Sequence, residues 1–179
     1  MITVIGIDPD YHNTGVVTIE NGRITEVREL TVPASVKGEY AVHDMIGELV
    51  WLDTLTEFPR LVVIEGQEVY ANKTEAKNAV VGLAHISGAA AAMSTHVGSD
   101  WLMPLPKEWK RNLDKKASQK NIMRRLGFGY DELANHLRPL WPWDIKTSHV
   151  IDAAGLALWG YDKLLKEQML EEELGRTAP

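Results

Sequence analysis

The first third of the chain carries the hydrophobic pattern of β-strands. Residues 2–8 form a nearly continuous apolar run that ends in an acid, and the segments 14–20 and 23–31 follow with strand-like patterns. Asn21-Gly22 separates the last two segments, and this dipeptide is a strong signal for a tight hairpin. The pattern therefore predicts a meander of three antiparallel strands.

Beyond residue 40, helical and strand patterns alternate. Apolar residues recur at helical spacing over 40–57, and the short apolar run 60–65 is typical of a central strand covered on both faces. The Ala-rich segment 74–95 predicts a second helix, and 100–105 predicts a fifth strand. The remaining segments are predicted to be helical: 117–126, 130–138 and 148–171.

The order of these elements defines the expected fold. Strands that are joined by helical crossovers lie parallel to one another. We therefore predict an α/β fold with a mixed five-stranded sheet, three antiparallel strands plus two parallel ones, and helices on both faces. A length of 179 residues suits one domain, expected over 1–160, with 161–179 as the end of the last helix and an acidic tail.

Composition narrows the possible functions. The chain has no cysteine, which excludes disulfides, thiolate metal sites and cysteine nucleophiles. It has no apolar run near the ~20 residues of a membrane span. No basic leader precedes the first strand pattern. We therefore expect a cytoplasmic protein with no membrane partner.

Charge is unevenly distributed along the chain. The net charge is −6, yet residues 107–125 hold eight Lys or Arg residues against Glu108 and Asp114, a local balance of +6. A basic surface on an acidic body can bind a polyanion, because salt confines each field to about 10 Å. Taken alone, the same segment is more typical of a solvated helix face.

Two predicted strands end in an acid, Asp8 and Glu65. If these strands are neighbours, the two carboxylates meet, and both stay ionised only beside a cation. His149 and Asp152 lie one turn apart on one face of the last helix, near its start. Oxygen ligands with one imidazole suit Mg²⁺ or Mn²⁺, and two such ions can activate water against a phosphodiester.

Simpler interpretations exist for each residue of this set. An Asp-Pro pair often only starts a turn, and a His/Asp pair one turn apart is often a cap or a solvated face. Asp10 is either a spare carboxylate at the site or a turn residue, and we favour the turn. The placement of all four residues at strand ends and a helix start favours the metal site.

Three segments together resemble the RuvC-type Holliday-junction resolvases, which have the RNase H-like fold: IGIDPDYHNTGVV, VVIEGQEVYANKTEAKNAVVGLAHISGAAAA and HVIDAAGLALWG. The resemblance implies a homodimer that nicks two opposed strands of four-way branched DNA, with no nucleotide cofactor. It implies two Mg²⁺ ions per site, with Mn²⁺ able to substitute. The catalytic and metal-binding residues would be Asp8, Glu65, His149 and Asp152.

The same resemblance suggests how DNA is held. An aromatic residue after Glu65, here Tyr70, would enter the junction centre, and Lys110 and Lys116 match the phosphate-binding lysines. The Ala/Gly-rich helix would form part of the dimer interface. The complete set of DNA-binding candidates is Tyr70, Lys73, Lys77, Lys107, Lys110, Arg111, Lys115, Lys116, Lys120 and Arg124.

Two other functions stay open at this point. A nuclease of the same fold that acts on branched DNA more broadly, or on RNA in the manner of RNase H, would use the same site. An actin-like ATPase also begins with an "IGID" strand and a T-G hairpin. That class needs two lobes, however, and 179 residues hold only one.

Overall fold

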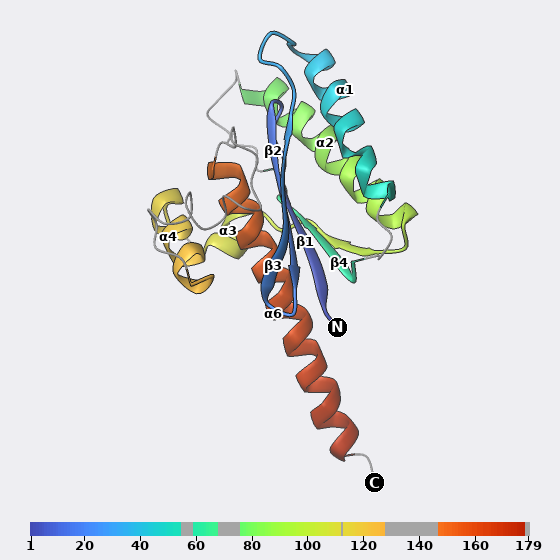
Figure 1. Cartoon of the computed structure of the whole chain (residues 1–179), viewed down its shortest axis with the longest axis vertical. Helices are drawn as coiled ribbons and strands as arrows, with labels where there is room; N and C mark the ends of the chain where they lie inside the picture. The colour runs from blue at the N-terminus through green and yellow to red at the C-terminus, as the bar shows by residue number, and fades with distance from the viewer. Residues whose placement is uncertain (55–58, 68–75, 112, 128–146, 178–179) are drawn as a thin grey trace.

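A five-stranded mixed sheet forms the centre of the described chain (Figure 1). The structure is a computed structural model that describes residues 1–54, 59–67, 76–111, 113–127 and 147–177. The strands, in chain order, are β1 (Thr3–Asp8), β2 (Asn13–Glu20), β3 (Arg23–Thr31), β4 (Leu61–Ile64) and β5 (Asp100–Leu102).

The strands lie in the order β3-β2-β1-β4-β5. The pairs β1–β2 and β2–β3 are antiparallel, and the pairs β1–β4 and β4–β5 are parallel, which confirms the predicted sheet. The register sets Ile7 of β1 beside Ile64 of β4. The next residues, Asp8 and Glu65, therefore reach the same edge of the sheet.

Helices cover both faces of the sheet, as predicted (Figure 1). One face carries α1 (Glu39–Glu48), the 3₁₀ helix η1 (Leu49–Thr54) and α2 (Ala76–His96). The other face carries α3 (Pro106–Lys110), α4 (Lys115–Arg125) and α6 (Thr147–Thr177). Among the described residues, no helix is long and apolar enough to cross a bilayer.

Strand alternation builds a separate core on each face. In β1, Val4 packs with the α6 side, whereas Ile5 and Ile7 pack with α1 and α2. Successive side chains of a strand point to opposite faces, so one strand contributes to both cores. Full burial of each such aliphatic side chain stabilises the fold by about 1.5–3 kcal/mol. The edge of the sheet at which Asp8 and Glu65 lie is therefore between two packed cores.

Two glycines allow α6 to lie directly against the sheet. A Cβ added to Gly6 would lie 2.0 Å from the carbonyl oxygen of Ala153, and one on Gly15 would lie 2.4 Å from that of His149. Only the absence of a side chain permits backbones to approach so closely. This contact fixes the first turns of α6 beside the end of β1.

Some predicted boundaries are wrong. The helix expected over 40–57 is α-helical only to Glu48 and then tightens into η1, a common way for a helix to end. The strand expected over 100–105 stops at Leu102. Pro104 follows it, and proline cannot donate to a strand ladder. Pro106 then begins α3, a helix that was not predicted, because proline suits the first helical turn.

The C-terminal region is helical further than expected. The helix predicted over 148–171 spans Thr147–Thr177, so the acidic stretch belongs to α6. Figure 1 shows the last turns of α6 projecting beyond the sheet. The domain boundary expected at residue 160 falls inside this helix and stays a prediction. The helix predicted over 130–138 lies outside the described residues.

Candidate active site

Asp8 and Glu65 stand at the edge of the sheet where β1 and β4 end. Asp8 is the last residue of β1 and is buried, and Glu65 follows β4 directly. The backbone N–H of Glu65 donates to the carbonyl of Ile7 over 2.9 Å, which extends the pairing of the two strands by one residue. The predicted proximity of these two acids is confirmed.

The first turns of α6 bring His149 to Asp8. The two side chains are joined at 2.8 Å, between Nδ1 of His149 and Oδ2 of Asp8. An ionised carboxylate only accepts, so Nδ1 carries the proton and donates it. This hydrogen bond raises the pKa of His149, against the opposing effect of burial. In the neutral ring, Nε2 keeps its lone pair, which is the form that binds a metal.

Lys110 lies between the acids rather than on the outer surface. Its Nζ lies 3.0 Å from Oε1 of Glu65 and 3.4 Å from Oδ2 of Asp152, and its side chain is 15% exposed. Burial acts to lower the pKa of Lys110, but the charges of Glu65 and Asp152 outweigh it and raise the pKa. Lys110 therefore stays charged and neutralises part of the acid cluster.

Glu65 shows that this neutralisation is incomplete. Burial raises the pKa of Glu65, and the charge of Asp8 raises it further, to about 7, although Lys110 acts in the opposite direction. A carboxyl group that holds its proton near neutral pH lacks a sufficient positive partner. We call Asp8, Glu65, His149 and Asp152 the acid cluster. Lys110 does not balance the negative charge of this cluster fully, so a further cation would be favoured there.

Asp152 is held from several sides. It is 2% exposed, and Nε2 of Gln119 donates to its Oδ1 over 3.1 Å. Its Oδ2 faces Lys110 at 3.4 Å and Lys115 at 3.5 Å. Burying a carboxylate is costly unless it is paired and hydrogen-bonded, and these contacts supply both conditions. Gln119 carried no signal in the sequence, because a glutamine inside a basic helix resembles any solvated polar residue.

The acid cluster fits a hard divalent cation in its chemistry. Carboxylate oxygens and one imidazole are ligands that Mg²⁺ and Mn²⁺ accept. In the described part of the chain, no three Asp, Glu or His side chains are gathered tightly enough to enclose an ion as they stand. The ammonium of Lys110 takes the position between two of the carboxylates. A cation bound by Glu65 and Asp152 would therefore compete with the ammonium of Lys110.

A basic surface borders the acid cluster on the α3–α4 side. Most of the predicted DNA-binding residues within 107–125 are exposed, and they lie on or beside the two helices. Lys110 is the exception, since it points into the acid cluster. Lys115 belongs to both, because its side chain is 55% exposed and also reaches Asp152. The exposed members are Lys107, Arg111, Lys115, Lys116, Lys120 and Arg124.

Three further candidates cannot be placed against the site. Tyr70 and Lys73 lie outside the described residues. Lys77 lies at the start of α2, and only its backbone is described. Their predicted contacts with DNA stay predictions.

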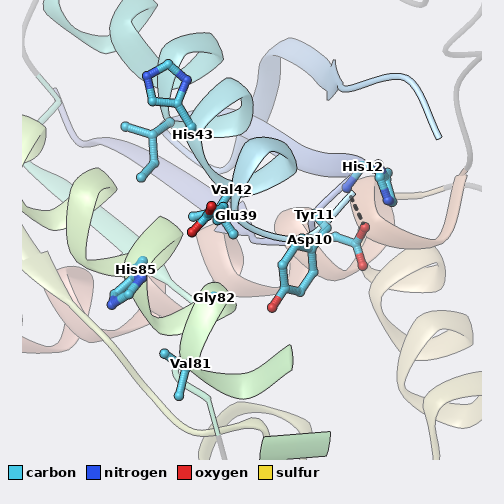
Figure 2. A pocket seen from close by; sticks show the side chains of 11 residues that line it. Asp10, Tyr11, His12, Glu39, Val42, His43, Val81, Gly82 and His85 are labelled. Carbon is cyan, nitrogen blue, oxygen red and sulfur yellow. Dashed lines mark hydrogen bonds between the residues drawn. The ribbon is translucent and has the colours of Figure 1, made fainter. Parts of the chain in front are cut away.

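Asp10 is a turn residue, as favoured from the sequence. Its Oδ1 accepts the backbone N–H groups of His12 at 2.9 Å and Asn13 at 3.3 Å. A carboxylate that receives its own downstream N–H groups is typical of an Asx turn. Figure 2 shows the contact to His12, at one end of a groove.

That groove, of about 930 Å³, lies between this turn, α1 and α2 (Figure 2). The ring of Tyr11 rests against Gly82 of α2, where a Cβ would lie 2.2 Å from the Tyr11 hydroxyl. No member of the acid cluster is among the described residues that line it. The groove is therefore separate from the acid cluster.

Comparisons with known proteins agree with this architecture. The chain matches no protein-family model and no curated protein sequence. The structure is similar to that of RuvC from Thermus thermophilus in complex with a Holliday junction substrate, with a TM-score of 0.64, 20% identity, and 88% of this chain and 91% of that chain covered. A second RuvC structure from Thermus thermophilus gives a TM-score of 0.59 and 17% identity over the same shares.

The structure also has a weaker likeness to the yeast mitochondrial Holliday junction resolvase Ydc2. The TM-score is 0.48 and the identity 12%, with 92% of this chain and 85% of that chain covered. The two RuvC structures decide the class of fold. The chain has the RNase H-like fold. The sheet and helices of this chain are arranged as in these two RuvC structures, over 88% of this chain.

Proposed function

We propose that this chain is a structure-selective endonuclease that resolves four-way DNA junctions by hydrolysing opposed phosphodiesters, in the cytoplasm. One observation carries the proposal: Asp8, Glu65, His149 and Asp152 converge from two strand ends and a helix start, beside an exposed basic surface. The RuvC structure of similar fold holds a Holliday junction, and this supports the choice of substrate.

The acid cluster would hold the metal ions, two Mg²⁺ with Mn²⁺ as a substitute. Bound divalent cations polarise a phosphate and lower the pKa of water. The residues of the chain set the conditions for binding. Asp8 fixes the ring of His149. Burial and the charge of Asp8 raise the pKa of Glu65, and a bound cation would favour the ionised form of this carboxylate. Lys110, displaced from Glu65 and Asp152, would turn its charge toward a DNA phosphate.

The exposed basic surface would hold the DNA backbone. Lys and Arg contacts to phosphates supply most of the affinity for DNA and carry no sequence information. Lys116 and Lys120 lie exposed on α4, the helix whose Gln119 and Lys115 reach Asp152. A strand bound along α4 would therefore run past the acid cluster. Selection of junctions would come from shape rather than from base readout.

A homodimer would deliver paired cuts. The exposed face of α2 carries small and apolar residues, among them Val81, Ala84, Gly88 and Ala92, and Val81 is 54% exposed. Such a face suits close contact between two helices. Light scattering of the purified protein should give about twice the mass of one 20.0 kDa chain.

The function is tested with a matched pair of variants. Asp8→Asn removes a charge from the acid cluster, whereas Asp10→Asn changes an acid two residues away and keeps an oxygen for the turn. Asp8→Asn should lose junction cleavage in Mg²⁺ and keep junction binding, and Asp10→Asn should cut at close to the rate of the unaltered protein. Normal cutting by Asp8→Asn would rule out the proposed site.

The same site also suits a broader nuclease for branched DNA. The observation behind this alternative is the exposed basic surface, since Lys and Arg contacts to phosphates bind the backbone of any DNA arm. A flap substrate decides between the two. Cutting of flaps as fast as junctions would favour the broader activity.

A further inference from the structure

Gln119 is a buried residue whose side chain contacts Asp152 of the acid cluster. It lies on α4 and is 5% exposed, although glutamine usually stays in water. Its amide nitrogen donates to Oδ1 of Asp152 over 3.1 Å and to the carbonyl oxygen of Ser148 over 3.2 Å. One amide group therefore links α4 both to a candidate metal ligand and to the first turn of α6.

The two oxygens of Asp152 have different surroundings. Oδ1 accepts from Gln119, in a buried contact. Oδ2 faces the ammonium groups of Lys110 and Lys115, at 3.4 Å and 3.5 Å. Oδ2 is therefore the oxygen that faces positive charge beside the acid cluster. Oδ1 is engaged by the hydrogen bond from Gln119 and does not face these ammonium groups.

We propose that Gln119 is the positioning residue of the acid cluster: it holds Oδ1 of Asp152 so that Oδ2 faces the metal. This inference rests on the proposed function. The terminal torsion of an aspartate is soft, so the carboxylate needs an external contact to fix its plane. Without this donor, Oδ1 would be a buried acceptor with no partner, and Asp152 would turn to regain one.

The chemistry of an amide suits this position better than the alternatives. A lysine in place of Gln119 would bring a positive charge that competes with the metal, as Lys110 already does between Glu65 and Asp152. A glutamate in its place would set a second carboxylate against Asp152, and two acceptors form no hydrogen bond. A neutral donor fixes Asp152 and leaves its charge available. Partners that orient metal ligands in this way typically account for 10- to 100-fold in metal affinity or activity.

The test measures Mn²⁺ binding by the full chain, read from the electron paramagnetic resonance signal of free Mn²⁺. Gln119→Met keeps the volume and removes the donor, and Gln119→Asn keeps the amide on a shorter stem that cannot reach Asp152. The control is Ser118→Ala, because Ser118 is a buried neighbour on α4 that lines a cavity beside Trp159. Thermal unfolding checks that each variant is folded.

Both Gln119 variants should bind Mn²⁺ at least tenfold more weakly, and Ser118→Ala should bind as the unaltered protein does. Folded Gln119 variants with unchanged Mn²⁺ affinity would overturn the positioning role. A failure of the unaltered protein to bind Mn²⁺ would overturn both the metal site and the role of Gln119. Tight Mn²⁺ binding with no cutting of junctions would refute the proposed function alone and leave the positioning role standing.

Discussion

Gly6→Ala tests whether the contact between β1 and α6 sets the geometry of the acid cluster. A Cβ at Gly6 would lie 2.0 Å from the carbonyl oxygen of Ala153 and 2.6 Å from the backbone nitrogen of Ala157. Both contacts are with helix backbone, which cannot rotate away as a side chain would. The helix must therefore withdraw from the sheet by roughly 1 Å before any ordinary contact distance is reached.

The cost of this withdrawal follows from the packing of α6. Forcing an extra methyl into a filled core typically costs about 1–3 kcal/mol, and a backbone clash belongs at the upper end of that range. For a chain of this size, each kcal/mol lowers the unfolding temperature by about 2–4 °C. Asp152 adjoins Ala153, so a shift of about 1 Å would also misplace a site residue, which can cost ~10²-fold in rate.

Thermal unfolding and junction cleavage together provide the assay. The matched control is Gly47→Ala, since Gly47 is an exposed residue of α1 with no atom within 4 Å of an added Cβ. That change should stabilise the protein by about 0.5–1 kcal/mol, because alanine favours helix over glycine. Unchanged stability and cutting in Gly6→Ala would refute the close packing of α6 on β1.

Four further predictions concern the charges of the acid cluster and of the basic surface. Because Glu65 has a pKa of about 7 and must be deprotonated to bind a cation, Mn²⁺ affinity should fall as pH drops from 8 to 6. The same raised pKa predicts that the metal-free protein loses stability as pH rises from about 4.5 to 7, as measured by urea unfolding. Lys110→Met should strengthen Mn²⁺ binding, because it removes an ammonium 3.0 Å from Glu65; equal affinity would place Lys110 outside the metal position. Lys116→Ala should make the slope of log K for junction binding against log salt concentration shallower by about 0.9 for each lost phosphate contact. An unchanged slope would exclude Lys116 from the interface.

Much of the fold could be predicted because the strands carry their own pattern. The alternation of Val4, Ile5 and Ile7 between two cores, and the Asn21-Gly22 turn, are local features that a sequence displays directly. The acids Asp8 and Glu65 could be paired in advance because parallel neighbours end at one edge. These predictions needed only strand order.

The parts that could not be predicted depend on contacts between distant segments. Lys110 belonged by sequence to a uniform basic segment, and only the short helix α3 turns it toward Glu65 and Asp152. Helix α3 has five residues, too few to show helical periodicity. Gln119 reaches Asp152 across 33 positions of the chain, and no local pattern marks such a pair.

Nicking of an immobile four-way DNA junction tests the central claim most directly. The unaltered protein is mixed with the junction and with a matched linear duplex, in Mg²⁺ and in EDTA, and the cut positions are mapped on all four strands. The account predicts paired nicks at symmetric positions on two opposed strands, no cutting of the duplex, and no cutting in EDTA. An intact junction in Mg²⁺, or equal cutting of the duplex, would contradict it.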